Sequence, residues 1–163
     1  MEFAAIDFET TGYENGGTNE PWQLGLAIVR GGAIVETREF FFEVREGAGS
    51  GRPDGESPIR PSGTLLETFP DWSPLLMGQR LVAHNIACEK TILTRTAPLT
   101  KWGPWVDTMK LAKARYPKLP SFALGDVCEA LGCVPQMAGR TWHDGLYDAV
   151  ACAELALRLA LPF

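Results

Sequence analysis

The sequence predicts a single α/β domain whose sheet begins with three consecutive antiparallel strands. Residues 3–6, 22–29 and 34–44 are apolar runs typical of strands. Arg30-Gly31-Gly32-Ala33 separates the last two runs, and Gly-Gly at this place is a hairpin signal. Further along, short strand-like runs alternate with stretches of helical periodicity, as in α/β folds. The 163 residues are enough for one domain with a proper core and too few for two comfortable ones.

Composition narrows the class of protein. The net charge of -5 and the pI of about 5.1 argue against a long nucleic acid held by a basic surface. They leave room for a few nucleotides at a strand end, because bound metal ions can supply positive charge locally. We expect a cytoplasmic protein, since the first residues lack the basic region of a signal peptide and no apolar run approaches about 20 residues. The four cysteines have no CxxC spacing, so we interpret them as free thiols.

The first strand carries two carboxylates. Asp7 and Glu9 follow its apolar residues and precede the turn Thr10-Thr11-Gly12. Because side chains alternate along a strand, both acids share one face. Two ionised acids held close together at the end of a core strand repel each other unless a cation lies between them, and a hard divalent metal suits such a site. The alternative is an edge strand that runs out into solvent.

The Gly- and Pro-rich stretch at about 45–63 is predicted to be a mobile loop rather than a linker between domains, because the chain before it is too short to fold alone. This loop either borders the active site or is a harmless insertion. Just before it, Phe40-Phe41-Phe42 breaks the strand alternation, which predicts a β-bulge there or burial on both faces. After it, helical segments are predicted from near Gly63-Thr64 and over residues 74–77.

A strand over residues 81–83 is predicted to end at His84-Asn85 and to be followed by a helix over 86–97. Four residues of this helix fall on one stripe: Ile86, Glu89, Ile92 and Leu93. Glu89 therefore lies on the apolar face, either as a boundary residue or as a ligand.

Two further helices are predicted before the last one. The strand end at 105–108 runs into a helix, with Asp107 or Thr108 near its N-cap. Ser121 can cap the next helix, over 122–131, and Gly132 can end it.

The last helix is predicted from about Gly145 to Leu161. Asp148 continues a buried stripe formed by Cys152, Leu155 and Leu159. His143 stands five residues before Asp148. Again a carboxylate lies at the rim of a buried helix face.

Taken together, these residues resemble the DEDDh subfamily of the DEDD superfamily of 3′-to-5′ exonucleases. The family's motif Asp-x-Glu-Thr-Thr-Gly matches Asp7 to Gly12, and its His-Asn motif followed by an acid matches His84-Asn85 and Glu89. Its His-x4-Asp motif matches His143 and Asp148. Three motifs in order make a specific signal. The resemblance implies a ribonuclease H-like fold over residues 1–163, with three antiparallel strands first, then parallel strands, and flanking helices.

The resemblance also implies a two-metal site that holds Mg²⁺ or Mn²⁺. Asp7 would bridge both ions, Glu9 and Asp148 would complete one site, and Glu89 would support the other. His143 would act as the general base for the attacking water. The family usually has Asp where this chain has Glu89, and the extra methylene can weaken or reshape the second site.

Family analogy implies further residues that contact the terminal nucleotide: Phe8, Thr10, Thr11, His84 and Asn85. For Phe8, core packing is an equally good interpretation. For His84, the position before Asn85 favours a structural role that sets the start of the helix. Arg140, Lys110 and Lys113 are candidate phosphate contacts, although lone basic residues are usually just solvated.

The function implied is a metal-dependent 3′-to-5′ exonuclease. It would hydrolyse phosphodiester bonds at the 3′ end of single-stranded nucleic acid, DNA favoured, and release nucleoside 5′-monophosphates. It would act alone or with a polymerase or repair complex, away from membranes. Two alternatives stay open: a weak or inert nucleic-acid-binding scaffold in which Glu89 spoils the second metal site, and an exoribonuclease of short RNA.

Overall fold

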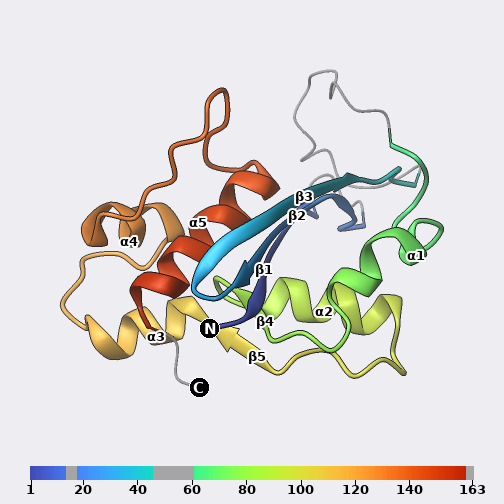
Figure 1. Ribbon diagram of the computed structural model, residues 1–163. Coiled ribbons are helices and arrows are strands. Elements are labelled where there is room, and N and C mark those ends of the chain that lie inside the picture. The colour runs from blue at the N-terminus through green and yellow to red at the C-terminus, as the bar shows by residue number, and fades with distance from the viewer. Residues whose placement is uncertain (14–17, 46–60, 161–163) are drawn as a thin grey trace.

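The computed structural model describes residues 1–13, 18–45 and 61–160 (Figure 1). One five-stranded sheet has the strand order β3-β2-β1-β4-β5. Its strands are β1 (Phe3–Thr10), β2 (Pro21–Arg30), β3 (Ala33–Phe41), β4 (Leu81–Ala83) and β5 (Trp105–Asp107). The helices are α1 (Phe69–Trp72), the 3-10 turn η2 (Ser73–Leu75), α2 (Ala87–Thr96), α3 (Thr108–Arg115), α4 (Leu124–Leu131) and α5 (Gly145–Arg158). The β1-β2 and β2-β3 pairs are antiparallel and the β1-β4 and β4-β5 pairs are parallel, so the predicted mixed sheet is confirmed.

The β2-β3 hairpin turns at Gly31 and Gly32, as predicted. Both residues have positive φ, 59° and 83°, which a two-residue hairpin turn requires. The predicted bulge, however, lies elsewhere in the hairpin. Val29 pairs with Ile34 while Ile28 pairs with Glu36, which leaves Val35 as the extra residue. Of the two alternatives for Phe40-Phe41-Phe42, the bulge is therefore wrong: the pairing there is regular, Phe40 and Phe41 are half-buried, and Phe42 is buried. β3 ends at Phe41.

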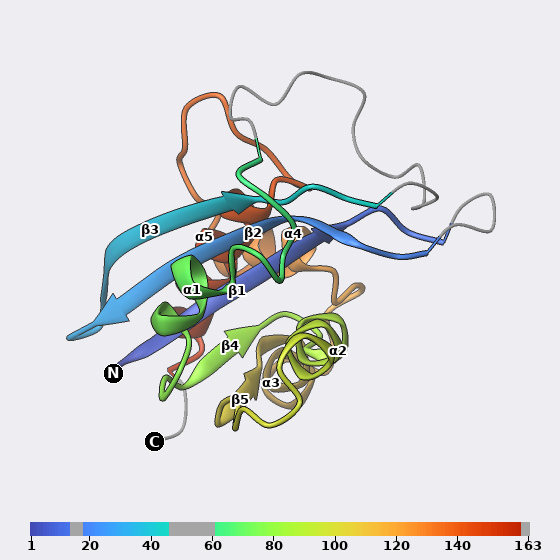
Figure 2. The ribbon, with the colours of Figure 1, turned by 90° about the vertical axis from the view of Figure 1, so that its right-hand side faces the viewer.

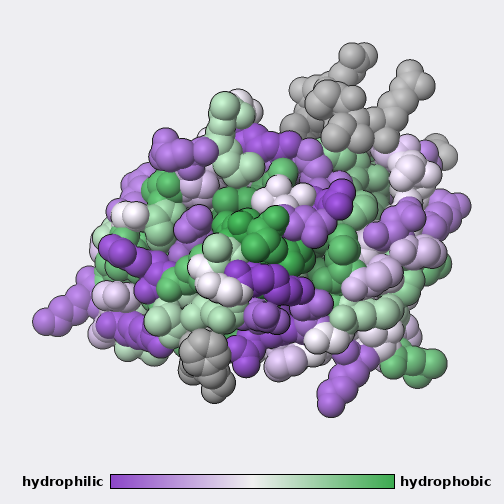
Figure 3. Space-filling model, viewed as in Figure 1, coloured by the Kyte–Doolittle hydropathy of each residue, from purple (hydrophilic) through white to green (hydrophobic). Residues whose placement is uncertain are grey.

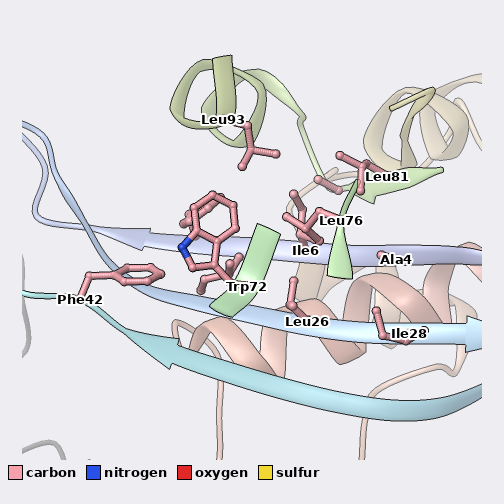
Figure 4. Packing of buried hydrophobic residues seen from close by; sticks show 12 residues of the cluster. Ala4, Ile6, Leu26, Ile28, Phe42, Trp72, Leu76, Leu81 and Leu93 are labelled. Carbon is pink, nitrogen blue, oxygen red and sulfur yellow. The ribbon is translucent and has the colours of Figure 1, made fainter. Parts of the chain in front are cut away.

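Helices cover both faces of the sheet, and the alternation of β1 sorts its residues between them. Ala4, Ile6 and Phe8 belong to the core cluster that also holds residues of α1 and α2, among them Trp72 and Leu93 (Figure 4). Phe3 and Ala5 belong to a second cluster that holds α5 residues. The two views of the ribbon show α5 on one side of β1 and α1 and α2 on the other (Figures 1 and 2). Asp7 and Glu9 continue the series of Phe3 and Ala5, and therefore face α5.

Several helix predictions need correction. The segment expected over 74–77 is the 3-10 turn η2, Ser73–Leu75. The helix expected from Gly63 begins only at Phe69, and Thr64 and Glu67 close a turn before it with side-chain hydrogen bonds of 2.8 to 3.3 Å. α4 begins at Leu124, two residues later than predicted, and its N-cap is Ala123 rather than Ser121, whose hydroxyl accepts the Ala123 amide over 3.3 Å. α5 ends at Arg158. Residues 46–60 of the predicted 45–63 loop lie outside the described residues.

The outer helices α3 and α4 pack against α5 through a third core cluster, which includes Ala112, Val127 and Leu155. In the space-filling view, hydrophobic residues are visible in the middle of one face, with hydrophilic residues along most of its rim (Figure 3). None of the helices described is both long and apolar enough to cross a membrane.

Candidate active site

Strand β1 presents the two acids of the first motif to α5. Asp7 pairs with Gly25 on β2, and Glu9 pairs with Gln23. Both acids lie inside the strand, which runs on to Thr10, rather than after its end. Asp7 and Glu9 are half-buried and share one face of the sheet, as the alternation predicted.

The first turn of α5 lies directly on β2, and glycine makes this approach possible. A Cβ on Gly25 would lie 1.9 Å from the carbonyl oxygen of Gly145, which no side chain could tolerate. A Cβ on Gly145 would in turn lie 3.3 Å from the carbonyl oxygen of Asp7. Close backbone contact is a standard use of glycine. It brings Asp148, in the first turn of α5, towards the acids of β1.

His143 lies just before α5, in contact with Asp148. Its backbone N–H donates to Oδ2 of Asp148 over 3.1 Å, and its φ of 68° is left-handed. The ring is exposed. One ligand atom from each of Glu9, His143 and Asp148 lies within 4.8 Å of the others, a spacing that could hold a metal ion. Asp7 and Glu89 are not members of this group.

Glu89 lies on the inward face of α2, as its stripe predicted, and is 4% exposed. Its Oε2 atom and Oδ1 of Asp148 are the only buried side-chain oxygens among the described residues that lack a hydrogen-bond partner. Leaving a buried carboxylate oxygen unpaired is costly. Each of these atoms is therefore suited to a cation. Two different helices contribute one such oxygen each.

The pKa values of these acids follow from burial and from their mutual repulsion. Burial, followed by the charges of Glu89 and Glu9, raises the pKa of Asp7 well above its usual range. Burial raises the pKa of Glu89 to about 7, although the backbone amides of Glu89 and Phe8 oppose the rise. Burial likewise raises the pKa of Asp148 to about 6, against the opposing effect of His143.

The pKa of Glu9 is raised by burial and by the charge of Asp148, and the charge of His143 opposes that rise. In all four acids the pKa is thus raised when no cation is near. Carboxylate oxygens are the donors that Mg²⁺ and Mn²⁺ prefer. The donor set, the unpaired oxygens and the repulsion all fit a site for divalent cations.

His84 has a structural environment, as its position before Asn85 suggested. Its Nε2 donates to the Phe122 carbonyl over 2.8 Å, and its Nδ1 lies 2.9 Å from the Thr108 hydroxyl. Burial lowers the pKa of His84, so the neutral ring accepts from Thr108. Both nitrogens are used inside the protein. A substrate contact through this ring does not fit that placement.

Asn85 is exposed with a φ of 66°, and its backbone N–H donates to Oδ1 of Asp107 over 3.1 Å. The same oxygen caps α3 by accepting the amides of Met109 and Lys110, so the predicted N-cap at Asp107 is confirmed. Asp107 thus holds the starts of two helices together. The Asn85 side chain stays a candidate substrate contact.

The remaining candidate substrate contacts differ in exposure. Phe8 is 6% exposed and packs in the core, which favours the packing interpretation of its ring. Thr11 is fully buried, where its hydroxyl donates to the Thr18 carbonyl and accepts the Glu20 amide. Thr10 is half-buried. Of these three side chains, only Thr10 is placed to reach a ligand.

The sequence analysis missed the residues that hold the start of α5. Asp144 is the N-cap, and its Oδ1 accepts the amides of Leu146 and Tyr147. Gln23 is 2% exposed, and its Oε1 accepts the Gly145 amide over 3.0 Å. Asp144 could have been found as an Asp directly before a predicted helix. Gln23 could not, because its role depends on strand register.

Among the basic candidates for phosphate contact, Arg140 is already bound to two carboxylates, those of Glu39 and Asp144. The Lys113 ammonium lies 5.6 Å from the centre of the Phe122 ring. Lys110 is exposed on α3. Arg140 therefore serves the protein's own structure.

No protein-family model matches the sequence. Among characterised proteins, the chain is 27% identical over 155 residues to a PolC-type DNA polymerase III of Mycoplasmopsis pulmonis (strain UAB CTIP). The match covers 88% of this chain and only 11% of that polymerase.

Solved structures of exonucleases are similar over nearly the whole chain. Exonuclease X in complex with 5′ overhanging duplex DNA has a TM-score of 0.65 and 23% identity, over 96% of this chain and 89% of that one. E. coli Exonuclease I with a dT13 oligonucleotide has a TM-score of 0.72 and 16% identity, over 96% and 40%. A 3′-exonuclease that recognises a histone mRNA stem-loop has a TM-score of 0.71 and 19% identity, over 96% and 62%. The predicted mixed sheet with flanking helices is therefore confirmed, as a fold that this chain shares with exonucleases of known structure.

Proposed function

We propose that this chain is a metal-dependent exonuclease that removes nucleoside 5′-monophosphates from the 3′ end of single-stranded nucleic acid. The observation that carries the proposal is the pair of unpaired buried oxygens, one on Glu89 and one on Asp148. They come from two helices on either side of β1, whose own acids lie between them in a fold shared with exonucleases. Acids of like charge are seldom gathered in this way without a cation.

The residues would divide the work as follows. Asp7, Glu9 and Asp148 would hold the ions, with Glu89 as the fourth carboxylate. When bound, two divalent ions activate a water and neutralise charge on the leaving 3′ oxygen. His143 would take the proton of the attacking water, because its exposed ring lies beside the carboxylates of Glu9 and Asp148.

DNA is the favoured substrate, and Mg²⁺ or Mn²⁺ the favoured ion. Support comes from what the similar proteins are: a DNA polymerase, and exonucleases solved with DNA. A zinc-bound form of E. coli Exonuclease I with single-stranded DNA also supports an ion at this site. The competing RNA activity is favoured by two other neighbours, the histone mRNA exonuclease and the RNase domain of yeast Pop2.

A time course on oligomers tests the reaction, its polarity and the sugar together. Single-stranded DNA and RNA, labelled at the 5′ or at the 3′ end, would be incubated with Mg²⁺, Mn²⁺ or EDTA. We expect a ladder of shortened 5′-labelled DNA, early release of labelled mononucleotide from the 3′ end, and no products in EDTA.

The control variants are Asp7→Asn, which should lose the activity, and Asp71→Asn, which changes an exposed acid on α1 and should keep it. Full activity of the Asp7 variant would refute the proposal.

The scaffold alternative rests on Glu89 in place of Asp. Isothermal titration with Mn²⁺ separates it from the enzyme, because two bound ions support the enzyme and none supports the scaffold. A cytoplasmic location and a polymerase or repair partner stay predictions. Fractionation and co-purification would test them.

A further inference from the structure

The segment that carries His143 is held by one arginine between two carboxylates. The Nη1 and Nη2 atoms of Arg140 donate to both oxygens of Glu39, over 2.8 and 2.6 Å. Nη1 also donates to both oxygens of Asp144, each over 2.9 Å. The side chains are largely covered, with 26%, 15% and 30% of Arg140, Glu39 and Asp144 exposed. Bidentate guanidinium–carboxylate pairs of this kind are strong and fix geometry.

Arg140, Glu39 and Asp144 together form a clamp on the segment that carries His143. Strand register places this clamp beside the acids of β1. Gly25 pairs with Asp7 on one side and with Glu39 on the other, so the three residues form one row across the sheet. Paired residues point to the same face, and Gly25, which has no side chain, receives the backbone of Gly145. Asp7 and Glu39 therefore flank the start of α5. One row of the sheet supplies both an expected metal ligand and the anchor for the segment before α5.

The segment that carries His143 has a second anchor, the Trp142 ring. The Trp142 ring packs edge to face on Tyr147, with 4.9 Å between ring centroids, and lies over Gly125 of α4. The Tyr147 hydroxyl donates to the Pro135 carbonyl. His143 lies between Trp142 and Asp144, and its own ring is exposed. Its position therefore comes from the residues on either side of it and from the hydrogen bond of its backbone N–H to Asp148.

From this arrangement we infer that Arg140 and Glu39 are positioning residues, which hold His143 where its imidazole can reach a water beside Glu9 and Asp148. The inference rests on the proposed exonuclease function. Lysine could not replace the arginine, because a single ammonium cannot bind both carboxylates in two-pronged fashion. A direct phosphate contact by Arg140 is disfavoured, since both of its terminal nitrogens are already bound to carboxylates.

The kinetic test uses Arg140→Met, Arg140→Lys and Glu39→Gln, with Arg38→Met as the matched control. Arg38 is the neighbouring arginine on β3, 59% exposed and paired only with Glu36 among the described residues. We expect each clamp variant to lower kcat at least tenfold with KM within twofold, and the control to change neither.

A double-mutant cycle asks whether the clamp acts through His143. In a His143→Ala background, Arg140→Met should cause little further loss, because the group that it positions is absent. An equal loss in both backgrounds would overturn the inference. So would a selective rise in KM, which would indicate a substrate contact instead.

A readout independent of activity separates this inference from the proposed function. The chain has only two histidines, so the imidazole region of the proton NMR spectrum is simple, and His84 is an internal reference. In Arg140→Met, the His143 ring signals should move towards those of a free, solvated imidazole while the His84 signals stay. Unmoved His143 signals would refute the positioning role. Moved signals in a protein that shortens no oligomer would refute only the exonuclease proposal.

Discussion

The starts of α2 and α5 carry the same short pattern, a histidine five residues before an acid, and the two histidines do opposite things. His84 precedes Glu89 and His143 precedes Asp148. Each acid is buried, and each keeps one oxygen without a partner. The pattern therefore places the acid reliably. The pattern does not predict whether the histidine ring is bonded inside the protein or exposed.

The difference between the histidines lies in what surrounds each ring. The His84 ring is enclosed by Thr108 and Phe122, which occupy both of its nitrogens. The His143 ring is exposed, and only its backbone amide is tied, to Asp148. A ring with both nitrogens bound stabilises a fold, whereas a free ring held beside carboxylates can move a proton.

The largest expected effect comes from the free ring. His143→Ala should lower kcat by about 10²- to 10⁴-fold, the usual loss for a general base. The thermal unfolding temperature should change little, because the ring makes no hydrogen bond inside the protein among the described residues. Steady-state kinetics and calorimetry measure the two quantities. If the His143→Ala variant kept the kcat of the unchanged protein, His143 would have no catalytic role and would not differ from His84 in the way proposed.

The reverse result is expected for the enclosed ring. His84→Ala removes two hydrogen bonds and leaves the Phe122 carbonyl without its ring partner. The free energy of unfolding should therefore fall by about 2 to 4 kcal/mol. Urea unfolding measures the loss, and Lys90→Ala, an exposed change on α2, is the control. Below the unfolding transition, kcat should stay near that of the unchanged protein. A large loss of kcat in a fully folded variant would place His84 in catalysis.

The two acids should make the metal-free protein less stable as pH rises. The folded pKa values of Asp148 and Glu89, about 6 and about 7, lie above their ordinary values of 3.8 and 4.5. Between those values the folded state binds more protons than the unfolded state, so stability falls with rising pH and levels off above about 7. The total change should be on the order of 3 to 6 kcal/mol, with solvent screening of the partly exposed Asp148 favouring the lower figure.

Urea unfolding in EDTA at pH 5 and at pH 8 measures this fall. Saturating Mn²⁺ at pH 8 should restore the lost stability, because the ion binds only the folded site. A metal-free protein that is more stable at pH 8 than at pH 5 would contradict the clustering of these acids.

The smallest expected effect concerns the acid at the start of α2. Glu89→Asp restores the residue that the family pattern has at this position, and activity should rise by a factor of a few if ligand geometry alone limits it. Comparing kcat with Mg²⁺ and with Mn²⁺ measures the gain. A tenfold or greater fall would indicate that Glu89 is matched to its own surroundings, which already include the Phe8 amide.

Local patterns were enough to predict the elements and the acids of the site. Alternation placed Asp7 and Glu9 on one face, and helical periodicity placed Glu89 inward. The Glu39 partner of Arg140 was missed because it depends on which residue of β3 lies opposite Gly25. Pairing across strands is a property of the folded sheet, and short windows of sequence carry little information on it.

Helix starts were predicted less well than helix faces. The α4 prediction took Ser121 as the cap and so began the helix at residue 122, whereas the N-cap is Ala123 and the helix begins at Leu124. The bulge was sought at a run of phenylalanines, where the pattern is irregular. It formed instead at Val35, next to the turn.

That single inserted residue decides the sign of the charge that β3 presents to the start of α5. Val35 drops out of the pairing and shifts the rest of β3 by one position. In an unbroken continuation of the pairing of Val29 with Ile34, Arg38 would stand opposite Gly25 and Glu39 would point to the other face. A cation would then confront Arg140. The one-residue bulge beside the turn thus determines which charged side chain of β3 faces the start of α5, about three strand positions away from the bulge.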